Sequence, residues 1–176
     1  MEKNMNVKKM ILNAILIAIG ALLHQITPAL GLPMQPDFSL SMLFIIILIN
    51  GNYKTTLISS IIIGVFAALT TKFPGGQLPN IIDKIITGQV IYFLFKAIGS
   101  RVSDNIKILI ALSIGTIVSG LLFLGSASIL AGLPGSFTAL VTVVVLPAVF
   151  MNVILGSILY KAIRVSLKAS GVLVVK

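Results

Sequence analysis

Six long apolar stretches occupy most of this 176-residue chain, and the basic residues fall between them in a one-sided pattern. The stretches are residues 10–26, 38–49, 55–71, 81–97, 106–130 and 137–162. If the N-terminus is cytoplasmic and each stretch crosses a membrane, eleven of the thirteen Lys and Arg residues are cytoplasmic and only Lys72 and Lys84 lie outside. Such inside-positive asymmetry indicates membrane orientation. The sequence therefore predicts an all-α integral membrane bundle of six transmembrane helices with both termini cytoplasmic.

Composition agrees with this prediction. The chain is 57% hydrophobic and only 10% charged, with a mean hydropathy of +1.14, whereas soluble domains carry about 25% charge. Each span needs about 20 apolar residues, so we expect residues 1–176 to form one membrane domain. We interpret the net charge of +9 as loop charge that faces anionic lipid headgroups of the bilayer, not as a nucleic-acid surface. Without cysteine, disulfide and thiolate chemistry are excluded.

Two segments allow an alternative interpretation. Residues 1–23 have the charged start and apolar run of a signal peptide, but no clear cleavage site follows, so we expect an uncleaved first helix. Residues 38–49 are short for a span, and a re-entrant segment there would move the basic residues 96, 101 and 107 outside. The charge asymmetry favours a full crossing by residues 38–49, and therefore six spans in total.

The three predicted outer loops are rich in proline and glycine. They comprise residues 25–37, 72–80 and 131–136. Proline and glycine favour turns over continued helix. We therefore expect compact turns at the outer face.

A polar cluster spans residues 70–87, from the end of the third span into the fourth. If a helix begins near Asn80, then Asn80, Asp83, Lys84 and Thr87 share one face. Ionisable groups at membrane depth usually face a bundle interior or a wet cavity, so a polar cavity is favoured. The alternative is an Asp83–Lys84 pair at the headgroups. Since adjacent side chains point about 100° apart, we do not expect these two to pair directly with ease.

The turn that precedes this cluster contains Pro74, Gly75 and Gly76. Two glycines permit positive φ and close approach of a ligand to the backbone, and exposed N–H groups in such a turn can hold a carboxylate. A plain turn is equally compatible with the sequence.

Other polar residues lie at the ends of spans or within them. His24 and Gln25 close the first span and Asp37 opens the second. His24 has no second ligand at helical spacing, so we expect it to line the outer mouth and not to bind metal. Asn152 is the only amide of the sixth span, where an interhelical hydrogen bond and a ligand contact both remain open.

Small residues four positions apart mark two candidate helix contacts. The pairs are Ala14 with Ala18 in the first span, and Gly115 with Ser119 in the fifth. Such spacing lets two helix backbones approach closely, and packing within the bundle is the simplest interpretation of both.

Motifs for catalysis are absent from the sequence. It contains no G-x-x-x-x-G-K-[ST], no H-E-x-x-H and no G-x-S-x-G. We therefore expect no enzyme activity, no ATP hydrolysis by this chain and no cofactor. No chain of ionisable residues crosses the predicted core, so the energy for any transport must come from elsewhere.

Together these features resemble the TrpP-type tryptophan transporters, which are assigned to the S-components of energy-coupling-factor (ECF) transporters. The resemblance is carried by three segments: ILNAILIAIGALLHQITP, PDFSLSMLFIIILIN and KTTLISS…AALTTKFPGGQLPNIIDKIIT. Within the third, TKFPGGQLPNIIDK is the most specific part. The resemblance is densest over residues 54–87, whereas the last third of the chain supports only the number of spans.

This resemblance implies the substrate-binding subunit of a bacterial cell-membrane importer for tryptophan. The implied partners are a transmembrane T-component, on which Ala14 and Ala18 would dock, and two cytoplasmic ATPases. Substrate would bind near the outer face beneath the loop between the first two spans. Transport would involve toppling of the whole subunit in the membrane.

An amino-acid zwitterion needs a cation and an anion as partners. Lys84 or Lys72 could hold the carboxylate, and Asp83 or Asp37 the ammonium. The turn from Phe73 to Gln77 would close over the indole ring, and Gln77 or Asn80 could accept its N–H. Other aromatic wall candidates in the predicted outer half are Phe38, Phe66, Phe123 and Phe137.

Three other functions remain open at this point. The first is a self-contained secondary transporter or channel for a small metabolite, driven by ions or protons. The second is a membrane scaffold or holin-like protein, in which the polar cluster is only structural. An intramembrane enzyme is more remote, because no nucleophile and base are visible.

Overall fold

The computed structural model describes residues 7–27 and 37–169, and all of its regular elements are helical. In chain order they are α1 (Val7–Ile26), α2 (Phe38–Asn50), α3 (Tyr53–Leu69), α4 (Gln77–Ile98), α5 (Asp104–Ile110), the π-helical η1 (Ala111–Gly115), α6 (Thr116–Leu130), α7 (Phe137–Leu140), the π-helical η2 (Val141–Val145) and α8 (Leu146–Ala169). Two runs, 104–130 and 137–169, are continuous through their π-helical turns. The described chain therefore forms six helical segments, which confirms the predicted helical bundle.

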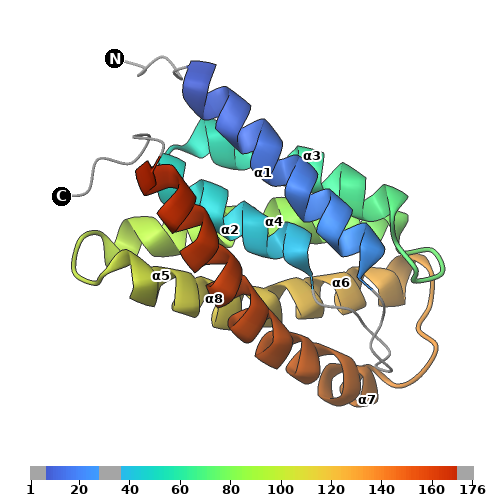
Figure 1. The fold of residues 1–176 in the computed structure, drawn as a ribbon. Coiled ribbons are helices and arrows are strands. Elements are labelled where there is room, and N and C mark those ends of the chain that lie inside the picture. The colour runs from blue at the N-terminus through green and yellow to red at the C-terminus, as the bar shows by residue number, and fades with distance from the viewer. Residues whose placement is uncertain (1–6, 28–36, 170–176) are drawn as a thin grey trace.

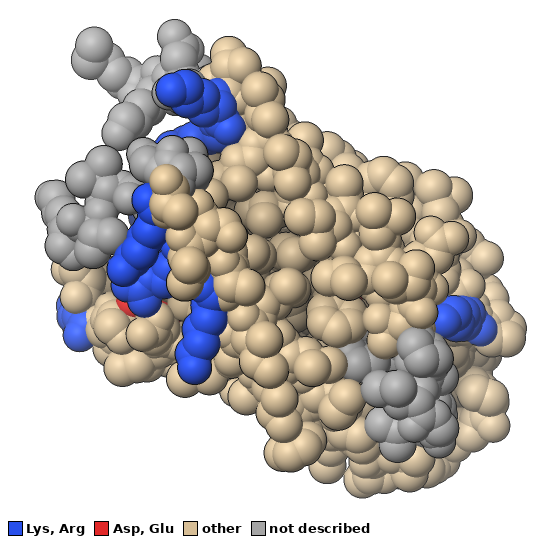
Figure 2. Space-filling model, viewed as in Figure 1, with Lys and Arg blue, Asp and Glu red and all other residues tan. Residues whose placement is uncertain are grey.

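The chain passes back and forth between two ends of the bundle. The end of α1, the start of α2 and the connections after α3 and α6 lie at one end, and the start of α1, the connection after α4 and the end of α8 lie at the other (Figure 1). The Lys and Arg side chains visible in Figure 2 gather mainly at the end where α1 begins and α8 ends. The predicted separation of a basic end from the proline- and glycine-rich end is thus present in the fold.

Three of the helical segments are long and apolar enough to cross a membrane: Val7–Ile26, Asp104–Leu130 and Phe137–Ala169. Helices α2 and α3 are apolar but shorter. Large apolar side chains such as Ile62 and Phe150 are exposed on the outside of the bundle. Exposed apolar surface of this extent is expected where lipid tails replace water.

Helix α2 lies at the centre of the bundle. Its residues 39–47 are all buried, and Leu43, Phe44 and Ile45 are completely inaccessible. At 1.5 Å per residue its 13 residues span about 20 Å, less than the hydrocarbon thickness of about 30 Å. Asp37 caps its N-terminus by accepting a hydrogen bond from the Leu40 N–H, and Gly51 ends it at φ 62°. Capping thus fixes Asp37 at the outer end of the central helix.

Helix α4 packs against α3 on one side and α6 on the other. Its contact with α3 requires Gly88, because a Cβ there would clash with Ser60 Oγ. The helix begins at Gln77, one turn earlier than the expected start near Asn80, because the turn at residues 73–76 leads directly into it. This packing holds the polar face of α4 inside the bundle.

Candidate functional site

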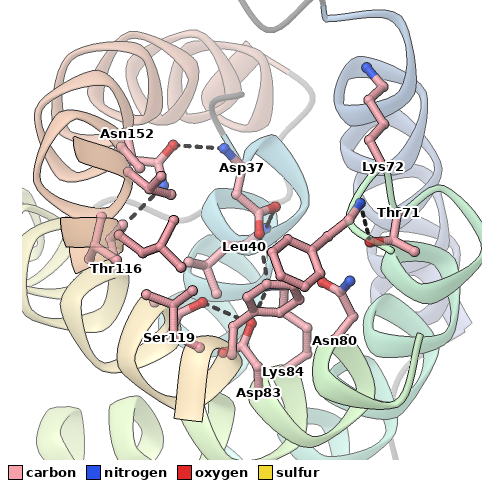
Figure 3. Close-up of a pocket in the computed structure, with 18 of the residues that line it drawn as sticks. Asp37, Leu40, Thr71, Lys72, Asn80, Asp83, Lys84, Thr116, Ser119 and Asn152 are labelled. Atoms are coloured by element: carbon pink, nitrogen blue, oxygen red, sulfur yellow. Dashed lines mark hydrogen bonds and ion pairs between the residues drawn. The ribbon is translucent and has the colours of Figure 1, made fainter. Parts of the chain in front are cut away.

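A cavity of about 310 Å³ opens among the helix ends opposite the basic end. Its walls come from α1, the start of α2, the turn before α4, the outer half of α4, and facing parts of α6, α7, η2 and α8 (Figure 3). The lining residues are His24, Asp37, Leu40, Thr71, Lys72, Phe73, Pro74, Asn80, Asp83, Lys84, Thr116, Ser119, Gly120, Phe123, Leu124, Pro134, Leu140, Val144, Val145, Ala148 and Asn152. This volume lies at the lower end of the range for small-molecule sites.

Lys84 lies between two carboxylates at the polar end of this cavity. Its Nζ is 2.8 Å from Asp37 Oδ2 and 2.5 Å from Asp83 Oδ2. The side chains of Lys84 and Asp83 are only 2% and 1% exposed, whereas that of Asp37 is 17% exposed. Buried charges require partners, and here one ammonium serves two acids.

Both carboxylate oxygens of Asp83 accept hydrogen bonds from the protein. Thr87 Oγ1 donates to its Oδ1 at 2.9 Å, and Ser119 Oγ donates to its Oδ2 at 2.9 Å, beside the Lys84 contact. Ser119 belongs to α6, so this carboxylate also joins α4 to α6. Asp83 thereby acts as a rigid counter-ion for Lys84.

The two carboxylate oxygens of Asp37 have different partners. Its Oδ1 accepts from the Leu40 N–H at 2.9 Å and from Ser39 Oγ at 2.6 Å, and His24 Nδ1 lies 3.6 Å away. Its Oδ2 faces Lys84. Asp37 precedes α2, and burial there would raise the pKa of its carboxyl, but Lys84 and His24 hold that pKa below its usual range. The group is therefore a carboxylate.

The backbone of Asp37 is also held, from across the bundle. Its N–H donates to Asn152 Oδ1 at 2.9 Å, and Asn152 Nδ2 donates to Thr116 Oγ1 at 3.2 Å. Thr116 Oγ1 in turn donates to the Leu112 carbonyl at 2.6 Å. A buried relay thus connects α6 and α8 to the start of α2 (Figure 3). For Asn152, the interhelical hydrogen bond is present and the side chain also lines the cavity.

Aromatic rings form the less polar side of the cavity. Phe73 and Phe123 meet edge to face, with ring centroids 5.2 Å apart and planes at 86°. Near them, Asn80 donates to the Gly76 carbonyl at 2.8 Å, which leaves its side-chain oxygen as an acceptor. Lys72 is exposed and donates to the Thr27 carbonyl at 3.3 Å. The cavity therefore combines charged and aromatic walls.

Most of the predicted site residues meet at this cavity. Those that line it are His24, Asp37, Lys72, Phe73, Asn80, Asp83, Lys84 and Asn152. Four others do not: Gln25, Gly75, Gly76 and Gln77. Gly75 adopts φ 71° at the tip of the turn, and the Gly76 N–H closes that turn onto the Phe73 carbonyl. Among the other predicted wall residues, Phe38, Phe66 and Phe137 are also outside the lining.

One expectation about side-chain geometry was wrong. Asp83 and Lys84 pair directly, although they are adjacent on one helix. The Lys side chain is long enough to turn its ammonium back toward the neighbouring carboxylate, and Asp37 approaches from the other side. The pair is buried in the bundle, not exposed at its rim.

Sequence reasoning missed the polar contribution of α6. Thr116 and Ser119 both line the cavity, whereas the Gly115–Ser119 spacing had suggested only packing. Their separation of three positions places two hydroxyls on one face of an otherwise apolar span, and this was the available signal. Within residues 7–27 and 37–169, no group of three or more His, Asp or Glu side chains could hold a metal ion.

Comparison with known proteins adds an independent line of evidence. The family described as "Tryptophan transporter TrpP" matches residues 6–168. A "probable tryptophan transport protein" of Clostridium perfringens is 51% identical, over 96% of this chain and 97% of the relative. Proteins with the same description are 48% identical in Clostridium acetobutylicum (93% and 96% covered) and 41% identical in Bacillus subtilis (95% and 96% covered). No solved structure matches the chain. The chain therefore belongs to the TrpP tryptophan transporter family.

Proposed function

We propose that this protein binds tryptophan in the cavity and is the substrate-binding subunit of an ECF-type importer. The observation that carries the proposal is the combination of the Lys84–acid cluster and the Phe73–Phe123 pair in one cavity of about 310 Å³. Tryptophan carries an ammonium, a carboxylate and an indole. The acids, Lys84 and the phenylalanine pair offer a partner for each of these groups. The family membership supports this substrate over other small molecules.

The orientation of the ligand follows from the walls. Lys84 donates to the substrate carboxylate and an acid of the cluster accepts from the ammonium, since charged partners give the strongest hydrogen bonds. The indole ring packs against Phe73 and Phe123, where edge-to-face contacts are favourable. Its N–H needs an acceptor, and the Asn80 side-chain oxygen is available at the cavity wall.

The ECF role rests on the surface of α1. Ala14 and Ala18 are both exposed on the outside of the bundle, so neither is used for packing within the described chain. A stripe of small residues on an exposed helix face suits the close approach of a second helix. We propose that this stripe docks on a transmembrane T-component, with two ATPases supplying the energy.

The orientation in the membrane follows the charge. The basic end, where α1 begins and α8 ends, faces the cytoplasm, and the cavity faces outward, in the cell membrane of a bacterium. Substrate would then enter the cavity from the outside.

A second candidate function is an ion-coupled transporter that needs no ATPase. It is favoured by one observation, the burial of Asp83 and Lys84 beside Asp37, because ionisable groups within a bundle also occur in proton pathways. The deciding experiment is uptake of labelled tryptophan into proteoliposomes with and without an ECF module. The proposal expects uptake only with the module and ATP. Uptake by the chain alone that a protonophore abolishes would contradict it and support the second candidate.

A further inference from the structure

We infer that the substrate zwitterion inserts between Lys84 and Asp37, replacing their direct ion pair, while Asp83 stays on Lys84 throughout. The inference rests on the proposed function and assigns different roles to two acids that the sequence presents alike. Asp37 becomes the residue that recognises the ammonium, and Asp83 becomes a positioning residue that acts through Lys84.

Asp83 is poorly suited to bind a ligand because both of its oxygens already accept from buried donors and its side chain is enclosed. Thr87 occupies one oxygen, and Ser119 and Lys84 share the other. Its side chain is 1% exposed. A ligand ammonium at Asp83 would compete with the hydroxyls of Thr87 and Ser119, and displacement of either would leave a buried polar group unsatisfied.

Asp37 has the opposite properties. Its side chain is 17% exposed, and its ties to α2 use only Oδ1 and the backbone. The Oδ2 atom faces Lys84. Exchange of the partner at Oδ2 would therefore leave the helix cap and the Asn152 contact intact. A ligand could therefore bind at the start of α2 without a change in the structure of the helix end.

The exchange also conserves charge. Before binding, Lys84 and Asp37 neutralise one another across 2.8 Å. After insertion, the ligand carboxylate would take the place of Asp37 on Lys84, and the ligand ammonium would take the place of Lys84 on Asp37. Each buried charge keeps a partner, as the low dielectric of the interior requires. A ligand without the ammonium would open the pair and leave the Asp37 carboxylate without a cation. A ligand without the carboxylate would leave Lys84 with Asp83 as its one remaining charged partner and would forgo the contact with the Lys84 ammonium.

A simpler arrangement would keep the pair closed. Lys84 has three N–H donors, and the two acids use two, so a ligand carboxylate could accept the third without displacing Asp37. In that arrangement the ligand ammonium contributes little, and an analogue without it should bind nearly as well. The two arrangements therefore differ in a measurable preference.

The test compares three ligands on the full chain: tryptophan, indole-3-propionate without the amino group, and tryptamine without the carboxylate. Insertion predicts that the parent binds tryptophan roughly 10- to 100-fold more tightly than either analogue. Asp37→Asn should bring the affinities for tryptophan and indole-3-propionate close together. Asp83→Asn should weaken all three ligands while the preference for tryptophan persists. Ser119→Ala removes only a donor to Asp83, so it should lower the same affinities as Asp83→Asn, but by a smaller factor.

Asp104→Asn is the matched control, because this acid is paired with Lys107 at 3.2 Å and is largely exposed. It should change none of the affinities. Equal binding of tryptophan and either analogue by the parent would overturn the inference even if no variant folds. Loss of the preference in Asp83→Asn and not in Asp37→Asn would also overturn it. If the parent binds none of the three ligands, the proposed function itself fails, and the inference with it.

Discussion

Lys84 Nζ lies 2.8 Å from Asp37 Oδ2, so an ion pair joins the polar face of α4 to the residue that begins the central helix α2. The contact connects two separate helical segments at the polar end of the cavity. Asn152 holds the backbone of Asp37 from α8, and Ser119 holds Asp83 from α6. Four helices thus contribute to one charged centre, and each contribution can be tested separately.

The first prediction concerns the Lys84 ammonium. Lys84→Met should weaken tryptophan binding by roughly 10- to 100-fold. It also leaves two buried carboxylates without their cation, so the free energy of unfolding should fall by about 3–5 kcal/mol. Ligand titration together with denaturant unfolding in detergent measures both effects. The double variant Lys84→Met, Asp83→Asn removes one charge of each sign and should recover stability without recovering affinity. Recovered affinity would show that Lys84 does not contact the ligand.

The second prediction concerns Asn152. Asn152→Leu removes the acceptor of the Asp37 N–H and the donor to Thr116. An unsatisfied buried donor costs about 1–3 kcal/mol, and we expect a fall of that size in the free energy of unfolding. The control is Asn105→Leu, because that amide is exposed and accepts from Arg164. An equal effect of the two substitutions would mean that the relay contributes nothing specific.

The third prediction concerns the aromatic wall. Phe123→Leu keeps an apolar side chain but removes the ring that meets Phe73. Because an aromatic pair contributes about 0.5–1.5 kcal/mol beyond burial, tryptophan affinity should fall by about 2- to 10-fold. Phe93→Leu, on the exposed side of α4, should leave the affinity unchanged. Unchanged binding in Phe123→Leu would place the indole elsewhere.

The fourth prediction concerns docking through α1. Replacing Ala14 and Ala18 with Leu should block close approach of a partner helix. ATP-dependent uptake should stop, while tryptophan binding by the purified chain stays near the parental value. Ala162→Leu, also exposed but on α8, provides the comparison. If binding is lost together with uptake, the two alanines serve the bundle itself and the docking proposal is wrong.

The fifth prediction concerns topology. The chain contains no cysteine, so single cysteines report their own exposure. A cysteine at Gln77, which is exposed at the cavity end, should react with an impermeant thiol reagent in intact cells. One at Ser103, exposed at the basic end, should react only after lysis. Labelling of Ser103 from outside would contradict the proposed orientation.

The sequence predicted the helices well, and many of the residues that it proposed for a site line one cavity, for physical reasons. Long apolar runs specify helices in a bilayer, and the polar residues Asn80, Asp83 and Lys84 had to face inward. The partners across the bundle were harder to predict. Ser119 and Thr116 are short polar residues whose spacing suits packing equally well, and the ion pair of Lys84 with Asp37 depends on how α2 and α4 meet.

The side-chain geometry at residues 83 and 84 could not be derived from helical spacing. Spacing describes where Cβ atoms point, whereas the long Lys84 side chain bends to serve Asp37 and Asp83 together. Likewise, the sequence left open whether the turn at residues 73–76 holds a ligand with its glycines or is a plain turn. In the structure Phe73 and Pro74 line the cavity, whereas Gly75 and Gly76 do not.

The most direct test of the account is equilibrium binding of labelled tryptophan to the purified parent chain, in competition with other amino acids and vitamins. The account predicts saturable binding at one site, displaced by unlabelled tryptophan and much less by phenylalanine or by ligands without an α-amino acid group. Absence of saturable binding, or equal displacement by an unrelated vitamin, would contradict it.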